Sequence, residues 1–163
     1  MSLPPPNPAH LLRAVEVALA AEREGNLPIG ACLVLDDEVV AEAGNAVLVP
    51  VYHPGRHAET RALARVEASL WPRARRMTCY TTLEPCVMCA GALLLHGVGR
   101  VVFGATDPEG GAGATLLANL PAYYSNGAGA PLWLGPLMPE LCDPLYERAR
   151  SRFDSLPCGR DNF

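Results

Sequence analysis

Two cysteines near the middle of the sequence have the spacing of a metal-binding pair. Cys86 and Cys89 are separated by two residues and follow Pro85. Cysteines at positions i and i+3 of a first helical turn lie on the same face, so both sulfurs can reach one point. The positive end of a helix favours the thiolate form, and two thiolates balance the charge of Zn²⁺. The pair therefore predicts half of a zinc site.

The run His57-Ala58-Glu59, further upstream, can complete that site. Three protein ligands and an open water position are typical of catalytic zinc, whereas four protein ligands close a structural site. His57 is the natural third ligand because it lies at a predicted helix start, and helix N-termini that follow strands gather along one edge of a sheet. Glu59 then points into the same space without being needed as a ligand. We therefore expect one zinc ion per chain on His57, Cys86 and Cys89.

Two other interpretations of the cysteine pair stay open. A Cys-x-x-Cys after a strand is also typical of thioredoxin-like redox pairs, although no Trp precedes it here, and a fourth ligand would make the zinc purely structural. We expect the remaining thiols and imidazoles to be core or surface residues rather than ligands. They are Cys32 and Cys79 in predicted strands, Cys142 and Cys158 in or beyond the last helix, and the histidines His10 and His96.

The elements that position these residues alternate between helices and strands. In the first half we expect a helix beginning at Pro8 and ended by Gly25, then a hairpin turning at Asp36 and Asp37, then a helix from about His57 to Leu70 stopped by Pro72. A strand over Met77–Leu83, a helix from Val87 ended by Gly97 and a strand over Arg100–Ala105 should follow. The last part should hold helical turns near Leu116–Leu120, a short strand in residues 132–137 and a final helix over Pro139–Phe153. This order indicates one α/β sheet with helices on both faces. The first hairpin is antiparallel and the later crossovers should be parallel, so the sheet should be mixed.

Length and composition indicate one domain. The chain has 163 residues, half of them apolar, and a chain of this size buries about 70% of its unfolded surface. We expect a single domain over 1–163, with an extended lead-in at 1–7 and a tail at 154–163. No apolar run reaches the roughly 18 residues of a membrane span, and the N-terminus lacks a secretory pattern, so we expect a cytoplasmic protein that does not enter membranes.

Charge bears on the substrate class. Thirteen basic and seventeen acidic residues give a net charge of −4, which does not favour a chain built to hold phosphates. Two arginine clusters either indicate that the chain does bind phosphates or are merely solvated surface. They are Arg73, Arg75 and Arg76 before the third strand, and Arg148, Arg150 and Arg152 on the last helix.

The two chemical motifs together resemble those of a known family. A His-x-Glu followed by Pro-Cys-x-x-Cys is the arrangement of zinc-dependent nucleobase deaminases. The likeness is to the cytidine deaminase superfamily, nearest its bacterial tRNA adenosine deaminase and guanine deaminase branches, and it covers roughly residues 8 to 118. It extends through Pro28-Ile29-Gly30, Thr82-Leu83-Glu84-Pro85-Cys86-Val87-Met88-Cys89-Ala90-Gly91-Ala92, Arg100-Val101-Val102-Phe103-Gly104-Ala105 and Asp107.

The resemblance implies a fold and a set of roles. The fold would be a three-layer α/β/α sandwich around a five-stranded mixed sheet. Zinc would be held by His57, Cys86 and Cys89, and Glu59 would shuttle protons. Asn45 would contact the base, although by itself it is equally well a turn residue, and we place Ala58 with it among the substrate-binding residues.

The sequence departs from those branches close to the expected pocket. They usually carry Asp-Pro-Thr-Ala before the zinc histidine, whereas this chain has His53-Pro54-Gly55-Arg56. Thr60 stands where those branches tend to have an aliphatic residue. The changes leave the metal site intact and point to a substrate other than the usual one.

The expected activity is hydrolytic deamination. Glu59 would accept the proton of zinc-bound water and pass it to a ring nitrogen and then to the leaving amine, so that a carbonyl and ammonia result. We favour a nucleobase or similar small aminated heterocycle as substrate, with adenosine in a tRNA anticodon loop as the alternative. The Tyr123-Tyr124 segment and the tail after Asp154 could close over a small ring. A non-catalytic zinc scaffold is disfavoured, because it has no use for an unliganded Glu59.

The sequence also predicts a homodimer. The helix from Val87 to His96 is apolar around much of its circumference, more than one sheet contact should need. The alternative is that the Leu116–Pro136 segment of the same chain covers the excess.

Overall fold

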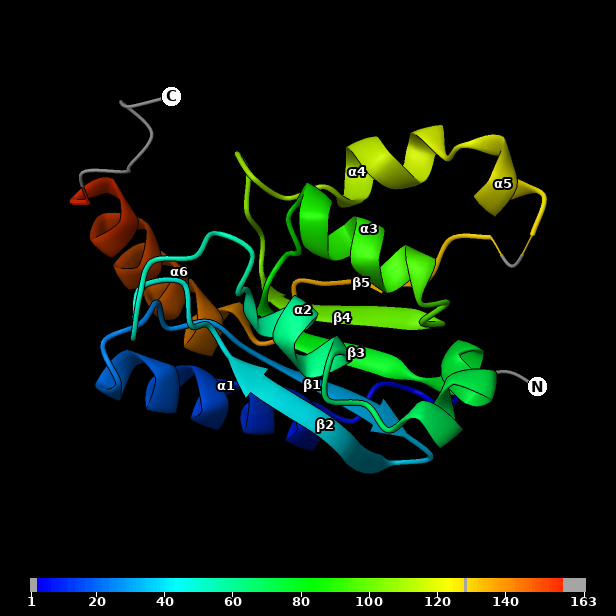
Figure 1. Ribbon diagram of the computed structural model, residues 1–163, viewed down its shortest axis with the longest axis horizontal. Helices are drawn as coiled ribbons and strands as arrows, with labels where there is room; N and C mark the ends of the chain where they lie inside the picture. The colour runs from blue at the N-terminus through cyan, green and yellow to red at the C-terminus, as the bar shows by residue number, and fades with distance from the viewer. Residues whose placement is uncertain (1–2, 128, 157–163) are drawn as a thin grey trace.

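A five-stranded sheet forms the centre of the computed structural model, which describes residues 3–127 and 129–156. The strands lie in the order β2-β1-β3-β4-β5 (Figure 1). They are β1 (Gly30–Leu35), β2 (Glu38–Gly44), β3 (Thr78–Leu83), β4 (Arg100–Ala105) and β5 (Leu132–Leu134). β1 pairs antiparallel with β2 and β3, whereas β4 runs parallel to β3 and β5 parallel to β4. The predicted mixed sheet is confirmed.

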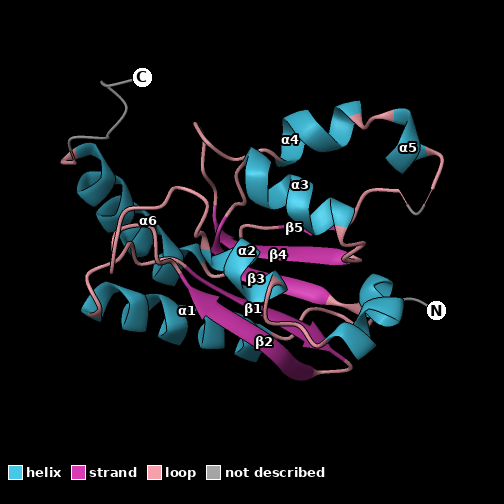
Figure 2. Ribbon diagram, in the orientation of Figure 1, coloured by secondary structure: helices cyan, strands magenta, loops and turns pink. Residues whose placement is uncertain are grey.

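Helices cover both faces of the sheet (Figure 2). The helices are α1 (Pro8–Arg23), α2 (Ala58–Leu63), α3 (Val87–Leu95), α4 (Gly113–Leu116), α5 (Ala122–Ser125) and α6 (Pro139–Asp154), with 3₁₀ helices η1 (Ala68–Arg76) and η2 (Leu117–Asn119). α1 and α6 pack on one face, and α2 and α3 on the other. The expected three-layer sandwich is confirmed.

The ends of the first helix and the first turn follow from local chemistry. The side chain of Asn7 accepts a hydrogen bond from the Ala9 amide and caps α1, and Pro8 supplies the fixed φ of the first helical position. Gly25 adopts a φ of +91° just after the helix. Asp36 and Asp37 both have positive φ, as a two-residue hairpin turn requires.

Alternating side chains of the central strands build two cores. In β1, Leu33 faces the layer of α2 and α3, whereas Cys32 faces α1 and α6. In β3, Cys79 likewise faces the layer of α2 and α3, and Tyr80 faces α1 and α6. Both faces are covered, so every residue of β1 is buried, and each large side chain such as Leu33 contributes about 1.5–3 kcal/mol. The prediction that Cys32 and Cys79 are core residues is confirmed, and Cys142 is likewise fully buried.

The predicted helix from His57 to Leu70 is wrong in its second half. α2 ends at Leu63, the chain turns, and the 3₁₀ helix η1 then runs through Pro72. Pro72 has no N–H and its ring would clash with an α-helical carbonyl, so this segment adopts a short, tighter helix instead of stopping at Pro72. The turn buries Val66 in the core between the two pieces.

The segment between β4 and β5 carries more helical turns than predicted, in α4, η2 and α5. Figure 1 places α5 beyond the C-terminal end of α3, away from the start of that helix. Tyr123 is 81% exposed there. The Tyr123-Tyr124 segment therefore does not close over the site described below. Cys158 and residues 157–163 of the expected tail lie outside the described residues.

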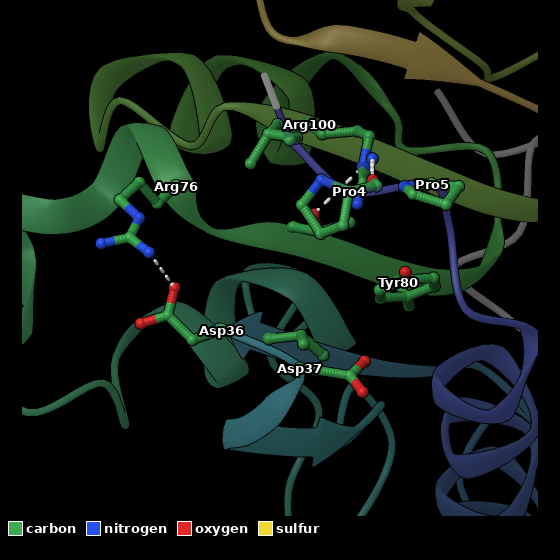
Figure 3. Close-up of a pocket in the computed structure, with 10 residues that line it drawn as sticks. Pro4, Pro5, Asp36, Asp37, Arg76, Tyr80 and Arg100 are labelled. Carbon is green, nitrogen blue, oxygen red and sulfur yellow. Dashed lines mark hydrogen bonds and ion pairs between the residues drawn. The ribbon is translucent and has the colours of Figure 1, made fainter. Parts of the chain in front are cut away.

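A cavity of about 180 Å³ lies where β3 and β4 begin. Figure 3 shows Arg100 in its wall, where its guanidinium donates to the carbonyl of Pro4 and to the Thr78 hydroxyl. Asp36 and Arg76 form an ion pair at its other side. The cavity is at the end of the sheet opposite to the cysteine pair, which follows the end of β3.

None of the helices in the described part of the chain is long and apolar enough to span a bilayer.

Candidate active site

The N-termini of α2 and α3 bring the predicted metal ligands together. His57 is the N-cap residue of α2, and Cys86 is the N-cap residue of α3. Cys89 lies in the first turn of α3, one turn from Cys86, as its spacing predicts. The expectation that the two helix starts meet at one edge of the sheet is confirmed.

The chain that enters α3 is held from outside the helix. The carboxylate of Glu84 accepts hydrogen bonds from the Asp107 amide and the Trp133 indole, each at 3.3 Å. The Pro85 carbonyl accepts from the Ala112 amide at 3.0 Å. Cys86 is therefore fixed by contacts that do not depend on a ligand. Sequence reasoning assigned no role to Glu84, because its partners lie more than twenty residues away.

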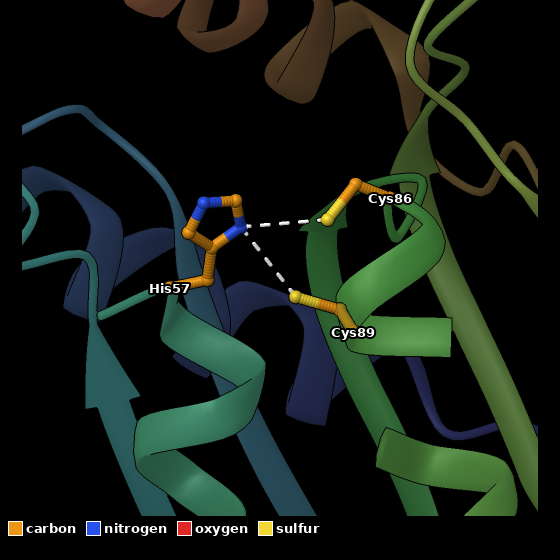
Figure 4. A group of neighbouring side chains, drawn as sticks. All are labelled: His57, Cys86 and Cys89. Carbon is orange, nitrogen blue, oxygen red and sulfur yellow. Dashed lines mark hydrogen bonds between the residues drawn. The ribbon is translucent and has the colours of Figure 1, made fainter. Parts of the chain in front are cut away.

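The nitrogen of His57 lies at the distance from each cysteine sulfur that tetrahedral zinc requires (Figure 4). Nδ1 of His57 lies 3.6 Å from Sγ of Cys86 and 3.5 Å from Sγ of Cys89. Zinc bonds of about 2.1 Å to nitrogen and 2.3 Å to sulfur, at a tetrahedral angle, give a separation of about 3.6 Å. All three atoms lie within 4.8 Å of one another. The residues present therefore fit a zinc ion with one further coordination position.

The two cysteines and the histidine shift one another's pKa values. The pKa of Cys86 is lowered to about 4, first by its hydrogen bond with Cys89 and then by His57, against the effect of burial. The same hydrogen bond, together with burial, raises the pKa of Cys89. Burial lowers the pKa of His57, but the hydrogen bond and charge of Cys86 and the charge of Glu59 outweigh it and raise the pKa. Metal binding requires both cysteines as thiolates, so a bound divalent ion would displace the thiol proton that Cys89 donates to Glu59.

Glu59 lies beside the ligands in the first turn of α2. Its side chain is 3% exposed, and Oε2 lies 3.3 Å from Sγ of Cys89. The other oxygen, Oε1, accepts a hydrogen bond of 2.7 Å from the hydroxyl of Thr81. Thr81 was not among the predicted site residues. A threonine within a β-branched strand is normally a strand former, and only the fold reveals its contact with Glu59.

The two predicted substrate-binding residues are both buried near α2. Asn45 follows the end of β2 and is 2% exposed; its Oδ1 accepts from the Val47 amide at 3.0 Å. Ala58 is fully buried, and its methyl group packs in the core cluster under α2 and α3. Only the main chain of Ala58, at the start of α2, is then suited to a substrate contact.

The departing residues 53–56 lie in a loop ahead of α2, and Thr60 of α2 is hydrogen-bonded to that loop. The Gly55 amide donates to Nδ1 of His53 at 3.1 Å, and the Thr60 hydroxyl donates to the Gly55 carbonyl at 2.9 Å. The guanidinium of Arg56 donates to the Val51 carbonyl. The Thr60 hydroxyl also lies 3.0 Å from the His57 carbonyl, so it contacts both this loop and the start of α2.

Two histidines lie outside the site, as expected. Nε2 of His10 is 2.7 Å from Oδ1 of Asp37 at the hairpin turn. His96 packs against Trp71 and bonds the Ala92 carbonyl at the end of α3.

Comparison with known protein families places the chain in one of them. Residues 7–105 match the family described as the cytidine and deoxycytidylate deaminase zinc-binding region. The chain belongs to this family. The matched range includes the three predicted zinc ligands and Glu59. The expectation of a zinc-dependent deaminase is thereby confirmed at the level of the family, and zinc is the metal that the three ligands fit.

Two relatives of the chain carry names that give different substrates. The tRNA-specific adenosine deaminase of Bacillus subtilis is 40% identical over 118 residues, which are 66% of this chain and 67% of that protein. The probable cytosine deaminase of Schizosaccharomyces pombe is 38% identical over 101 residues, 61% of this chain and 60% of that protein. The chain thus spans about three fifths to two thirds of these relatives.

Solved structures agree with the family. One structure has a TM-score of 0.71 and 29% identity to this chain, and the match covers 85% of this chain and 99% of that chain. It comes from studies of A-to-I editing by tRNA:A34 deaminases at the wobble position of transfer RNA. The guanine deaminase of Nitrosomonas europaea has a TM-score of 0.66 at 22% identity, over 91% of this chain and 87% of that chain. The second likeness supports the fold alone.

Proposed function

We propose that this deaminase hydrolyses the exocyclic amine of a nucleobase or a similar small aminated heterocycle, giving a ring carbonyl and ammonia. The observation that carries the proposal is the buried carboxylate of Glu59, with Oε2 3.3 Å from a zinc ligand, Sγ of Cys89. A non-catalytic scaffold would have no use for this carboxylate beside an open coordination position.

In the proposed reaction Glu59 moves the protons. Zinc on His57, Cys86 and Cys89 would supply hydroxide at neutral pH by lowering the pKa of a bound water to about 7. Oε2 of Glu59 accepts a proton from the attacking water and delivers it to a ring nitrogen of the substrate, while the water oxygen bonds the ring carbon that carries the amine. The same oxygen then takes the proton of the new hydroxyl group on that carbon and passes it to the exocyclic amine, so that the carbonyl forms, the carbon–nitrogen bond breaks and ammonia leaves. Water and amine are thus converted to carbonyl and ammonia without a redox step.

Asn45 is proposed to orient the base. Its Oδ1 is occupied by the Val47 amide, so the side-chain amide nitrogen is the atom assigned to an acceptor on the ring. The main-chain N–H of Ala58, at the start of α2, is assigned to the same task. A donor pair at fixed positions would select a ring that offers acceptors beside the reacting carbon.

The ion pairs of the arginines support a small substrate. Binding an anticodon loop needs cations that can contact phosphates. Most arginines of the two basic clusters already face carboxylates. The pairs are Arg73 and Arg76 with Asp36, Arg148 with Glu22, and Arg150 with Glu109 and Asp154. A phosphate would have to compete with these carboxylates, and the chain carries a net charge of −4.

Deamination of adenosine in a tRNA anticodon loop is the second candidate. The 40% identity to the Bacillus subtilis enzyme and the TM-score of 0.71 to a tRNA:A34 deaminase structure favour it. The altered loop from His53 to Arg56, with Thr60 bonded into it, counts against an unchanged substrate.

A homodimer is proposed as the working assembly. Val87 and Leu95 of α3 are 68% and 65% exposed, and they lie with Gly91 on one helical stripe at spacing i, i+4, i+8. A side chain added at Gly91 would meet open space. The Leu116–Pro136 segment leaves this stripe uncovered in the described residues, which supports a partner subunit there.

We also propose a cytoplasmic location, because Cys86 and Cys89 can bind zinc only while reduced, as cytosolic thiols are.

An ammonia-release assay on the zinc-loaded protein tests the substrate. The panel comprises adenine, guanine, cytosine, their nucleosides, further aminated heterocycles and an anticodon stem-loop. We expect the protein to turn over a free base at a rate that does not depend on salt concentration. Salt-sensitive conversion of adenosine to inosine in the stem-loop, with no free base turned over, would decide for tRNA. No turnover of any substrate by protein holding one zinc would decide for the scaffold.

A further inference from the structure

We infer that Thr81 is a positioning residue that aims the carboxylate of Glu59 at the metal site; the inference rests on the proposed role of Glu59. The Thr81 hydroxyl donates a hydrogen bond of 2.7 Å to Oε1 of Glu59. The opposite oxygen, Oε2, then faces Sγ of Cys89 at 3.3 Å. One carboxylate oxygen is anchored and the other is presented to the reaction.

The anchor is rigid because Thr81 lies in the middle of the sheet. Its backbone pairs with Ala31 of β1 on one side and with Phe103 of β4 on the other. The side chain is fully buried. Groups held on central strands keep their position more closely than groups on loops. β3 therefore fixes the hydroxyl without help from a substrate or a metal.

The hydroxyl has no evident role in packing alone. Thr81 is on the same face of β3 as Cys79, whose side chain packs in the apolar core below α2 and α3. Valine has nearly the same shape and would fill such a position without burying a hydroxyl that must be bonded. The bond to Glu59 satisfies the hydroxyl. A polar side chain at this position is thus explained by its partner.

Glu59 needs such an anchor because its side chain has three rotatable bonds and starts from a short helix. α2 has only six residues. A carboxylate that can rotate would present Oε2 in the productive direction only part of the time, and displacements of about 1 Å can lower a rate by roughly 100-fold. The Thr81 bond removes this freedom.

Three variants test the inference with the zinc-loaded protein. Thr81→Val removes the hydroxyl and keeps the shape, and Thr81→Ser restores the hydroxyl. Thr82→Val is the matched control, because Thr82 is as buried but accepts from the Gly30 amide at 3.2 Å instead of bonding Glu59. Steady-state ammonia release is measured with the panel substrate that the wild-type protein turns over fastest, together with zinc content and thermal unfolding.

We expect Thr81→Val to lower kcat by roughly 10- to 100-fold with KM and zinc content unchanged. Thr81→Ser should recover kcat to within about threefold of wild type, and Thr82→Val should retain it at the same level. A Thr81→Val kcat equal to that of Thr82→Val would overturn the inference. If Thr81→Val does not fold, Thr81→Ala takes its place under the same criteria.

A crystal structure of zinc-loaded Thr81→Val separates this inference from the proposed function. Absence of turnover by the wild-type protein would contradict the proposed function, but the structure would still decide the positioning role. We expect the Glu59 carboxylate to rotate away from its wild-type direction. A carboxylate that stays in place without the hydroxyl would contradict the role of Thr81.

Discussion

Oε2 of Glu59 lies 3.3 Å from Sγ of Cys89, although the two residues come from different helices. Glu59 belongs to the first turn of α2, and Cys89 to the first turn of α3. A carboxylate that is 3% exposed is costly to bury unless something compensates it. Here the Thr81 hydroxyl and the Cys89 thiol each donate a hydrogen bond to it. The contact thus connects the metal site with the group proposed to move protons.

The metal site should hold one zinc ion per chain, and each ligand should be required. His57→Ala or Cys86→Ala leaves two ligands, too few for a stable site. Metal analysis after dialysis should find about one zinc in wild type and little in either variant. Cys142→Ala is the matched control, because this thiol is buried in the other core and should leave the zinc content unchanged.

Asn45→Asp should separate the two uses of the Asn45 side chain. The carboxylate keeps an oxygen for the Val47 amide, so the loop should stay folded, but the donor assigned to the base is lost. We expect kcat/KM to fall by roughly 10- to 100-fold with zinc content unchanged. Unchanged kinetics would remove Asn45 from the substrate-binding residues.

The candidate metal ligands could be predicted from the sequence, whereas the residues that support them could not. The spacing of Cys86 and Cys89 is local and places both sulfurs on one helical face, so it predicts its own geometry. The anchoring of Glu59 by Thr81 joins residues 22 positions apart, and nothing in a strand-forming sequence marks it. The end of α2 was also missed, because apolar periodicity does not reveal where the chain turns to bury Val66.

The ion pair between Glu22 of α1 and Arg148 of α6 should give stability that depends on pH. The hydrogen bond from Arg148 holds the pKa of Glu22 below its usual 4.5. A carboxyl whose folded pKa is lowered stabilises the fold above its unfolded pKa and loses that effect as it is protonated. Both side chains are partly exposed, so the effect should be small.

Chemical denaturation of wild type and Glu22→Gln measures this pair. We expect a difference in unfolding free energy of about 0.2–1 kcal/mol at pH 7. The difference should shrink as the pH falls below 4.5 and vanish once Glu22 is protonated. A difference that is the same at pH 7 and pH 3 would show that the charge of Glu22 is not its cause.

Leu95→Glu should dissociate the proposed dimer. A carboxylate in the stripe of Val87 and Leu95 would be buried without a partner at the interface, which is strongly unfavourable. Light scattering at micromolar concentration should give a dimeric mass for wild type and a monomeric mass for the variant. Leu141→Glu, at a 40% exposed position on α6, should remain dimeric. A monomeric wild-type protein would refute the proposed assembly.

The role of Glu59 is tested most directly by Glu59→Gln in one measurement of ammonia release, with zinc content determined on the same sample. Glutamine keeps the shape and an oxygen for the Thr81 hydroxyl, but it cannot accept and deliver a proton. General acid–base catalysis contributes about 10²- to 10⁴-fold, so turnover should fall by at least that factor while one zinc per chain remains. Turnover by Glu59→Gln within about tenfold of wild type, at full zinc content, would contradict the account.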